Sequence, residues 1–253
     1  MDFLGTPDIG PLAFGGLMLA SLVTSFIGVF TGAAGGIVLL GLMATVMPPL
    51  ALIPVHTVVM LGSGVTRTMI MWRHVMRPAV LPFLIGSLIG AAAGARVFVA
   101  LTTVWLEFIL GAFILLVTWM PKLGRFGAER GRFAILGFGT TFLGVFVSAT
   151  GTLLAPFIAA STPDRRVHVA TMGALMMIAH LAKIAAFGFI GFAIGRYVPL
   201  MAAMILTGAV GSWFGEKALL RTQEHHFRLV LQITLTILGL RLLWTAARGA
   251  GWF

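Results

Sequence analysis

The sequence predicts an all-α polytopic membrane protein made of two inverted repeats. Its composition, its apolar runs and its internal motif matches lead to that prediction. Of the 253 residues, 59% are hydrophobic and 9% are charged, whereas soluble domains are about 45–50% apolar and about 25% charged. So few charged side chains cannot cover a water-soluble globule of this size. Disorder is excluded because the chain has far too much apolar surface.

The apolar residues gather into eight runs, and two of these runs are too long to cross a membrane once. The run over 11–47 would be about 55 Å long as a helix, against a hydrocarbon core of about 30 Å. Gly, Ser and Thr residues interrupt the two long runs, at 31–36 and at 148–152, and predict a break in each. Each half should therefore hold a broken helix pair and three transmembrane helices, about ten helical segments in total. The eight runs cover residues 11–47, 50–72, 79–100, 103–120, 133–161, 167–190, 198–216 and 227–247.

Short motifs recur in the two halves in the same order and predict an internal duplication. Phe26–Phe30 matches Phe142–Phe146, 116 residues further on. The spacing Gly90-x-x-x-Gly94 in the first half is echoed by Gly211-x-x-x-Gly215 in the second. The expected segments are a first transmembrane repeat, a cytoplasmic linker and a second transmembrane repeat, at residues 1–120, 121–132 and 133–253.

The basic residues predict the topology. The chain has 17 Lys and Arg against seven Asp and Glu, a net charge of +10. Many of these basic residues lie in short breaks between apolar runs, which is the positive-inside pattern of a cell (inner or plasma) membrane protein and not a nucleic-acid-binding face. If both long runs cross twice, each half crosses five times and the halves are inverted, as in many secondary transporters. The piece 37–47 is compatible with a full crossing or with a re-entrant segment.

The two predicted breaks are the main candidates for a binding site. Unwound backbone at membrane depth is tolerated where it is buried in protein or lines a watery cavity, and half-helix N-termini attract anions. The alternative is that Gly28, Gly32 and Gly36 only form a close helix-packing seam, and the sequence leaves both readings open. The candidate substrate-binding residues at the breaks are Thr31, Gly32, Gly35, Gly36, Ser148, Thr150, Gly151 and Thr152.

A few ionisable residues fall inside apolar runs. Lys183 lies mid-run with His180 one turn before it, and a charge inside the bilayer costs several kcal/mol unless it is paired or hydrated. Lys183 is therefore expected to attract an anion, and a histidine could carry a coupling proton. His56 and His168 begin the runs after each broken pair, where an interfacial cap is the alternative role. For Arg67, snorkelling to the interface is favoured over a role in charge compensation.

Several kinds of chemistry find no support in the sequence. It contains no phosphate-binding loop, no metal-ligand cluster, no nucleophile–base pair and no cysteine, so we expect neither enzyme activity nor a cofactor. Acidic residues near membrane runs are scarce, which disfavours a cation carrier and favours an anion as the substrate.

Two segments resemble the TauE/SafE family of membrane permeases, also called the sulfite exporter family. These are residues 26–41 (F-I-G-V-F-T-G-A-A-G-G-I-V-L-L-G) and 142–156 (F-L-G-V-F-V-S-A-T-G-T-L-L-A-P). The resemblance covers essentially the whole chain and implies ATP-independent transport of small organosulfur anions such as sulfite, sulfoacetate or other sulfonates. It also implies that the broken segments line the substrate path, with Thr57 and Thr171 beside them. The first half lacks a counterpart of Pro156, which makes the symmetry of the site imperfect.

We therefore expect a secondary transporter that works by alternating access, with proton coupling as an option. Two alternatives stay open: a membrane scaffold or assembly subunit that does not transport, and a transporter of a small anion without sulfur. The expected partners are a small anionic substrate and the lipid bilayer, with no nucleic acid, and glycine seams would permit a homodimer. The sequence is equally compatible with import and with export.

Overall fold

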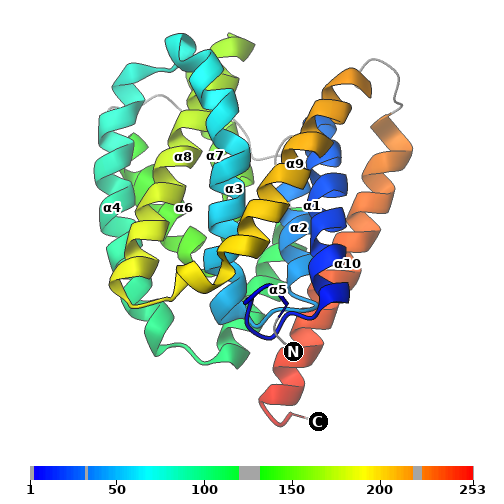
Figure 1. The fold of residues 1–253 in the computed structure, drawn as a ribbon. Coiled ribbons are helices and arrows are strands. Elements are labelled where there is room, and N and C mark those ends of the chain that lie inside the picture. Colours follow the sequence, from blue (N-terminus) through cyan, green and yellow to red (C-terminus); the bar gives the residue numbers. More distant parts are fainter. Residues whose placement is uncertain (1–2, 32–33, 120–131, 219–223, 253) are drawn as a thin grey trace. The chain divides into compact units, whose positions relative to one another are not determined.

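The structure is a computed structural model that describes residues 3–31, 34–119, 132–218 and 224–252. Within these ranges the regular structure is helical, as predicted, and contains no strand beyond one isolated β-bridge between Phe3 and Thr6 (Figure 1). The described α-helices are α1 (Pro11–Thr31), α2 (Ala34–Met43), α3 (Pro49–Met71), α4 (Arg77–Ala100), α5 (Thr103–Trp119), α6 (Arg132–Val147), α7 (Gly151–Ser161), α8 (Arg165–Phe189), α9 (Val198–Ala218) and α10 (Glu224–Gly249). The 3₁₀ helices are η1 (Trp72–His74) and η2 (Ile194–Tyr197).

The helices form two compact units that do not coincide with the two expected repeats. The first unit contains α1, α2, the beginning of α3, α5, α9 and α10, and the second contains the rest of α3 with α4, α6, α7 and α8. Each expected repeat therefore contributes helices to both units. The units span residues 1–59, 101–120 and 193–253, and residues 60–100 and 121–192, respectively.

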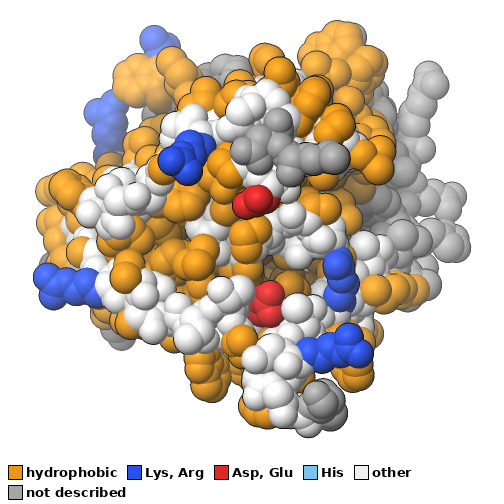
Figure 2. Space-filling model, turned by 60° about the horizontal axis from the view of Figure 1, so that its bottom comes forward, with side chains coloured by type: hydrophobic (Ala, Val, Ile, Leu, Met, Phe, Trp, Pro, Cys, Tyr) orange, Lys and Arg blue, Asp and Glu red, His pale blue; other side chains and the backbone are white. Residues whose placement is uncertain are grey.

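Many of the large hydrophobic side chains lie on the surface of the helices. Leu12 is 91% exposed and Phe189 is 93% exposed, which is costly in water but normal against lipid. Figure 2 shows hydrophobic side chains widespread on the surface, with basic and acidic side chains scattered among them. Four described helical stretches are long and apolar enough to cross a membrane: Pro11–Gly28, Arg77–Ala100, Arg166–Phe189 and Ile194–Gly215.

Each of the two overlong runs forms two helices. In the first, α1 ends at Thr31 and α2 begins at Ala34; in the second, α6 ends at Val147 and α7 begins at Gly151. The second helix of each pair has 10 or 11 residues, about 15–17 Å at 1.5 Å per residue. That is about half of the hydrocarbon core, so neither α2 nor α7 crosses it as a single straight helix.

The pair α6–α7 is a hairpin whose two ends meet. Arg132 Nη2, at the start of α6, donates hydrogen bonds to Ser161 Oγ and, over 3.3 Å, to Phe157 O near the end of α7. Ser161 Oγ in turn donates to Phe157 O at 2.7 Å. The chain therefore returns to its starting side after this run, in agreement with a run that enters and leaves on one side. Arg132, the last residue of the expected linker, is the first residue of α6.

Glycines make close helix contacts inside each unit, and these contacts correspond between the halves. In the second unit, a Cβ added to Gly90 of α4 would lie 3.0 Å from Phe138 Cα of α6. In the first unit, a Cβ added to Gly211 of α9 would lie 3.0 Å from Leu22 Cα of α1. Leu22 and Phe138 are 116 residues apart, the same spacing as the repeated Phe26 and Phe142 motifs. This agreement supports the internal duplication, and it shows these glycines packing within the chain.

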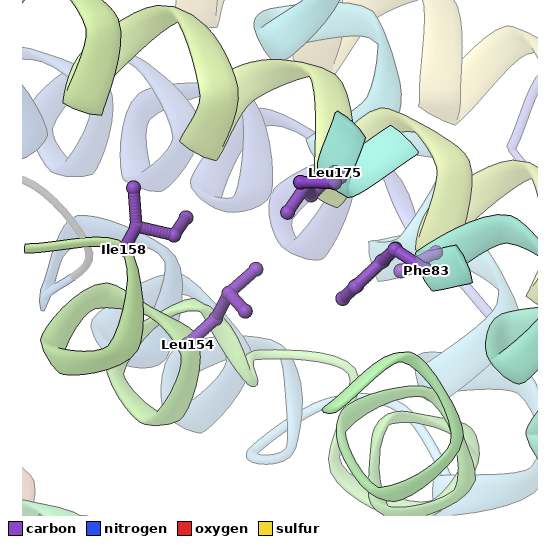
Figure 3. Close-up of a cluster of buried hydrophobic side chains, with 6 residues drawn as sticks. Phe83, Leu154, Ile158 and Leu175 are labelled. Carbon is purple, nitrogen blue, oxygen red and sulfur yellow. The ribbon is translucent and has the colours of Figure 1, made fainter. Parts of the chain in front are cut away.

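A buried apolar cluster holds the short helix α7 in place. Leu154 and Ile158 of α7 pack with Phe83 of α4 and Leu175 of α8, and all four side chains are fully buried (Figure 3). An isolated helix of this length is unstable, so packing against α4 and α8 stabilises α7. The cluster thereby fixes the position of the turn between α6 and α7.

Candidate functional site

A buried lysine lies at the break between α6 and α7. Lys183 of α8 is 0% exposed, and its Nζ donates a hydrogen bond to the carbonyl oxygen of Ser148 at 3.0 Å. Ser148 is also buried and has a φ of +55°, a left-handed conformation that costs roughly 1–2 kcal/mol for a non-glycine residue. Its N–H still donates to Gly144 O at 2.8 Å, so the helical hydrogen bonding of α6 ends at this residue.

Gly144 of α6 faces the same lysine. A Cβ added to Gly144 would lie 3.3 Å from Lys183 Nζ and 3.4 Å from Thr150 Oγ1, so the ammonium and the hydroxyl both lie close to this glycine. Thr150 is fully buried, and its Oγ1 has no hydrogen-bond partner among the described residues. The hydroxyl of Thr152, in the first turn of α7, is also buried and also has no hydrogen-bond partner among the described residues.

Among the described residues of its own unit, Lys183 has no carboxylate within ion-pairing distance of its ammonium. Among the described residues of the second unit, the one acidic residue is Asp164. Its Oδ1 accepts the Arg166 N–H at 2.7 Å and caps the start of α8. Asp164 is 19 residues before Lys183, about 28 Å along the helix, which is far beyond ion-pairing distance. Because an unpaired buried charge is costly, the site favours a ligand that brings a negative charge.

The other predicted residues on α8 lie at different distances from Lys183. His180 is 7% exposed and sits one turn before Lys183. Thr171 and His168 are 12 and 15 residues before Lys183, about 18 and 22 Å along the helix. The hydroxyl of Thr171 accepts the Met76 N–H at 2.9 Å, so Thr171 joins α8 to the residues that precede α4. The structure thus brings Ser148, Thr150 and Lys183 together, with His180 nearby, and leaves Thr171 and His168 apart.

In the first unit, a buried histidine contacts the second helix of the broken pair. His56 of α3 is fully buried, and its Nε2 donates to the carbonyl oxygen of Gly36 of α2 at 2.9 Å. The hydroxyl of Thr57 donates to Ile53 O of its own helix at 2.8 Å. A Cβ added to Gly35 would lie 2.8 Å from Gly28 Cα, so these two glycines bring α2 against α1.

Three of the predicted residues lie wholly or partly outside the described part of the chain. Gly32 belongs to the undescribed residues 32–33, and for Thr31 and Arg67 only the backbone is described, as the last residue of α1 and a residue of α3. Gly151, at the second break, is the first residue of α7.

The first unit also contains a cavity of about 290 Å³, and it involves none of the predicted binding residues. Glu107 of α5 and Arg241 of α10 both line it. Arg241 Nη2 donates to Thr45 O, just after α2, at 3.5 Å. We assign this cavity no part in the site at Lys183.

Gly144 is not among the site residues predicted from the sequence. Gly144 belongs to the repeated Phe142–Phe146 motif, in which it corresponds to Gly28 of the first half. The two glycines have different surroundings, because a Cβ added to Gly28 would meet Gly35 Cα at 3.7 Å and no polar side chain. A repeated glycine in the sequence therefore signals a close approach, but the partner in that approach depends on packing.

Apolar helices broken at mid-run, with a buried cation at one break, define the class as a helical membrane protein with an internal polar site. The family model described as sulfite exporter TauE/SafE matches residues 17–242, which is most of the chain. The chain therefore belongs to the sulfite exporter TauE/SafE family, as the resemblance of residues 26–41 and 142–156 indicated. Membership makes it a membrane protein of a sulfite- or sulfonate-type transporter family and not of an enzyme family. No curated protein and no solved structure matches the chain significantly.

Proposed function

We propose that the protein is a secondary transporter of small sulfur-containing anions such as sulfite, sulfoacetate or other sulfonates. The observation that carries the proposal is the buried ammonium of Lys183, which has a backbone carbonyl and no carboxylate beside it in the described part of its unit. An anion would form a charge-assisted hydrogen bond with this ammonium, roughly twice as strong as a neutral one.

The start of α7 provides further binding groups for the anion. Thr150 is the N-cap residue of α7, and its side chain makes no capping hydrogen bond. The first backbone N–H groups of a helix carry a partial positive charge and bind anions readily. With the hydroxyls of Thr150 and Thr152, these groups would surround an oxyanion with donors, while Lys183 balances its charge.

We further propose alternating access between two inverted repeats in the cell membrane, with residues 121–132 on the cytoplasmic side. The equivalent glycine contacts at Gly90 and Gly211 support two repeats of similar construction. The return of α6–α7 to its starting side, through Arg132 and Ser161, supports a run that enters and leaves the membrane on one side. If transport is proton-coupled, His180 is the coupling candidate closest in sequence to Lys183.

Anion-dependent thermal stabilisation of the purified protein tests the proposed function. Sulfite, thiosulfate, sulfoacetate and taurine would be compared with sulfate and acetate. A bound anion at about 100 times its Kd stabilises the folded state by about 2.7 kcal/mol. We expect organosulfur anions to raise the unfolding temperature of the wild type, and Lys183→Ala to abolish the effect.

Arg248→Ala is the matched control, because Arg248 is an exposed cation that stacks on Trp244 at 5.4 Å. This variant should keep the anion response of the wild type. Stabilisation by acetate alone would indicate a transporter of an anion without sulfur. The absence of any anion response would favour a scaffold and contradict the proposal.

A further inference from the structure

We infer that Gly144 sets the size limit of the anion site, because an anion oxygen that contacts both Lys183 Nζ and Thr150 Oγ1 would lie against the Cα of this residue. This inference rests on the proposed function of the α6–α7 break as an anion site. It adds a specificity-determining residue, and it predicts which anions the site excludes when that residue changes.

The geometry beside Gly144 comes from three atoms. A Cβ at position 144 would lie 3.3 Å from Lys183 Nζ, 3.3 Å from Lys183 Cδ and 3.4 Å from Thr150 Oγ1. Because Gly144 has no Cβ, the ammonium and the hydroxyl can both lie close to its Cα. A methyl group there would press on both polar groups and compete with any ligand atom that contacts both.

Some of the hydrogen-bond donors beside Gly144 have no acceptor in the described structure. A lysine ammonium has three N–H donors, and in the described structure Lys183 uses one of them on Ser148 O. The buried Thr150 hydroxyl donates to no described group. Ammonium and hydroxyl donors that both lie beside Gly144 suit an oxyanion oxygen, which accepts hydrogen bonds from both kinds of donor.

Gly144 differs from the other glycines of its helix in what surrounds it. A Cβ at Gly137 would lie 3.0 Å from backbone atoms of Phe83, so Gly137 is a packing position. A Cβ at Gly139 would meet nothing within 4 Å. At Gly144 the two nearest atoms belong to the long side chain of Lys183, which can shift by a few tenths of an ångström. Gly144→Ala is therefore expected to fold while it narrows the site.

The test measures anion affinity by thermal shift for Gly144→Ala, for the matched control Gly139→Ala and for wild type. The anions are formate and nitrite, with small planar heads, and sulfite and methanesulfonate, with three oxygens on sulfur. In Gly144→Ala the affinity for sulfite and methanesulfonate should fall at least tenfold more than the affinity for formate or nitrite. Gly139→Ala should stay within twofold of wild type for every anion.

Thr150→Val is the second variant, because it removes the hydroxyl at nearly constant size. We expect affinity for all four anions to fall threefold or more, with no change in their order. Equal affinities for Gly144→Ala and wild type would overturn the inference while leaving the proposed function intact. If Gly144→Ala does not fold, unchanged affinities in Thr150→Val would overturn it instead. A wild type that responds to none of these anions, and to no other organosulfur anion, would contradict the proposed function itself.

Discussion

At the scale of single residues, the complete burial of the Lys183 ammonium is difficult to explain unless the protein binds an anion. Removing a charge from water costs several kcal/mol even after the protein relaxes, and one hydrogen bond to the Ser148 carbonyl offsets only part of that cost. Structural lysines are normally paired or reach the surface, whereas Lys183 is fully buried. Its position in a membrane-spanning helix therefore fits a role in binding better than a role in stability.

Lys183→Met separates these two roles. Met has a similar length without the charge, and replacing buried charged groups by apolar ones is often neutral or stabilising by about 1–4 kcal/mol. We expect the anion-free variant to unfold at the same or a higher temperature than wild type, and to lose its response to sulfite. A clear drop in the unfolding temperature of the anion-free variant would show that Lys183 stabilises the fold instead.

The residues at the site were predictable only in part. The run lengths and the Gly, Ser and Thr residues located the second break, and Lys183 was conspicuous as a charge in an apolar run. The sequence could not show that the Thr171 hydroxyl accepts a hydrogen bond from the Met76 N–H, or that Gly28 and Gly144 meet different partners. Those facts depend on which helices are neighbours in space, and apolar helices carry few residues that specify their neighbours.

At the scale of the elements, glycines decide which helices approach closely. Gly90 brings α4 against α6, and Gly211 brings α9 against α1, so each of these contacts joins a helix of one expected repeat to a helix of the other. Motif matching predicted the glycine spacings but not this exchange of partners. In membranes, such small-residue contacts drive helix association because the hydrophobic effect does not favour one apolar surface over another.

Gly90 and Gly211, which make equivalent contacts, should contribute similarly to the stability of the fold. Gly90→Ala and Gly211→Ala each place a Cβ against the backbone of the partner helix, and overpacking of this kind typically costs 1–3 kcal/mol. We expect both variants to lower the unfolding temperature by similar amounts. Gly139→Ala, which meets nothing within 4 Å, should leave that temperature unchanged. A loss of stability in only one of the variants Gly90→Ala and Gly211→Ala would argue against equivalent helix packing in the two repeats.

At the scale of the whole molecule, the proposed topology places both the turn after α7 and the turn before α4 on the cytoplasmic side. The natural chain has no cysteine, so single cysteines give an unambiguous label. His74→Cys and Pro163→Cys, both at exposed positions, should react with a membrane-impermeant thiol reagent from the cytoplasmic side. Thr102→Cys, also exposed, should react from the opposite side. Labelling of Pro163→Cys and His74→Cys from different sides would contradict an α6–α7 run that enters and leaves the membrane on one side.

Sulfite flux in proteoliposomes measures directly whether Lys183 binds the transported anion. Equal amounts of wild type, Lys183→Ala and Arg248→Ala would be reconstituted, and release of trapped sulfite would be followed over time. We expect rapid release with wild type and with Arg248→Ala, and release at least tenfold slower with Lys183→Ala. Sulfite release at the wild-type rate in Lys183→Ala would show that Lys183 does not bind the transported anion.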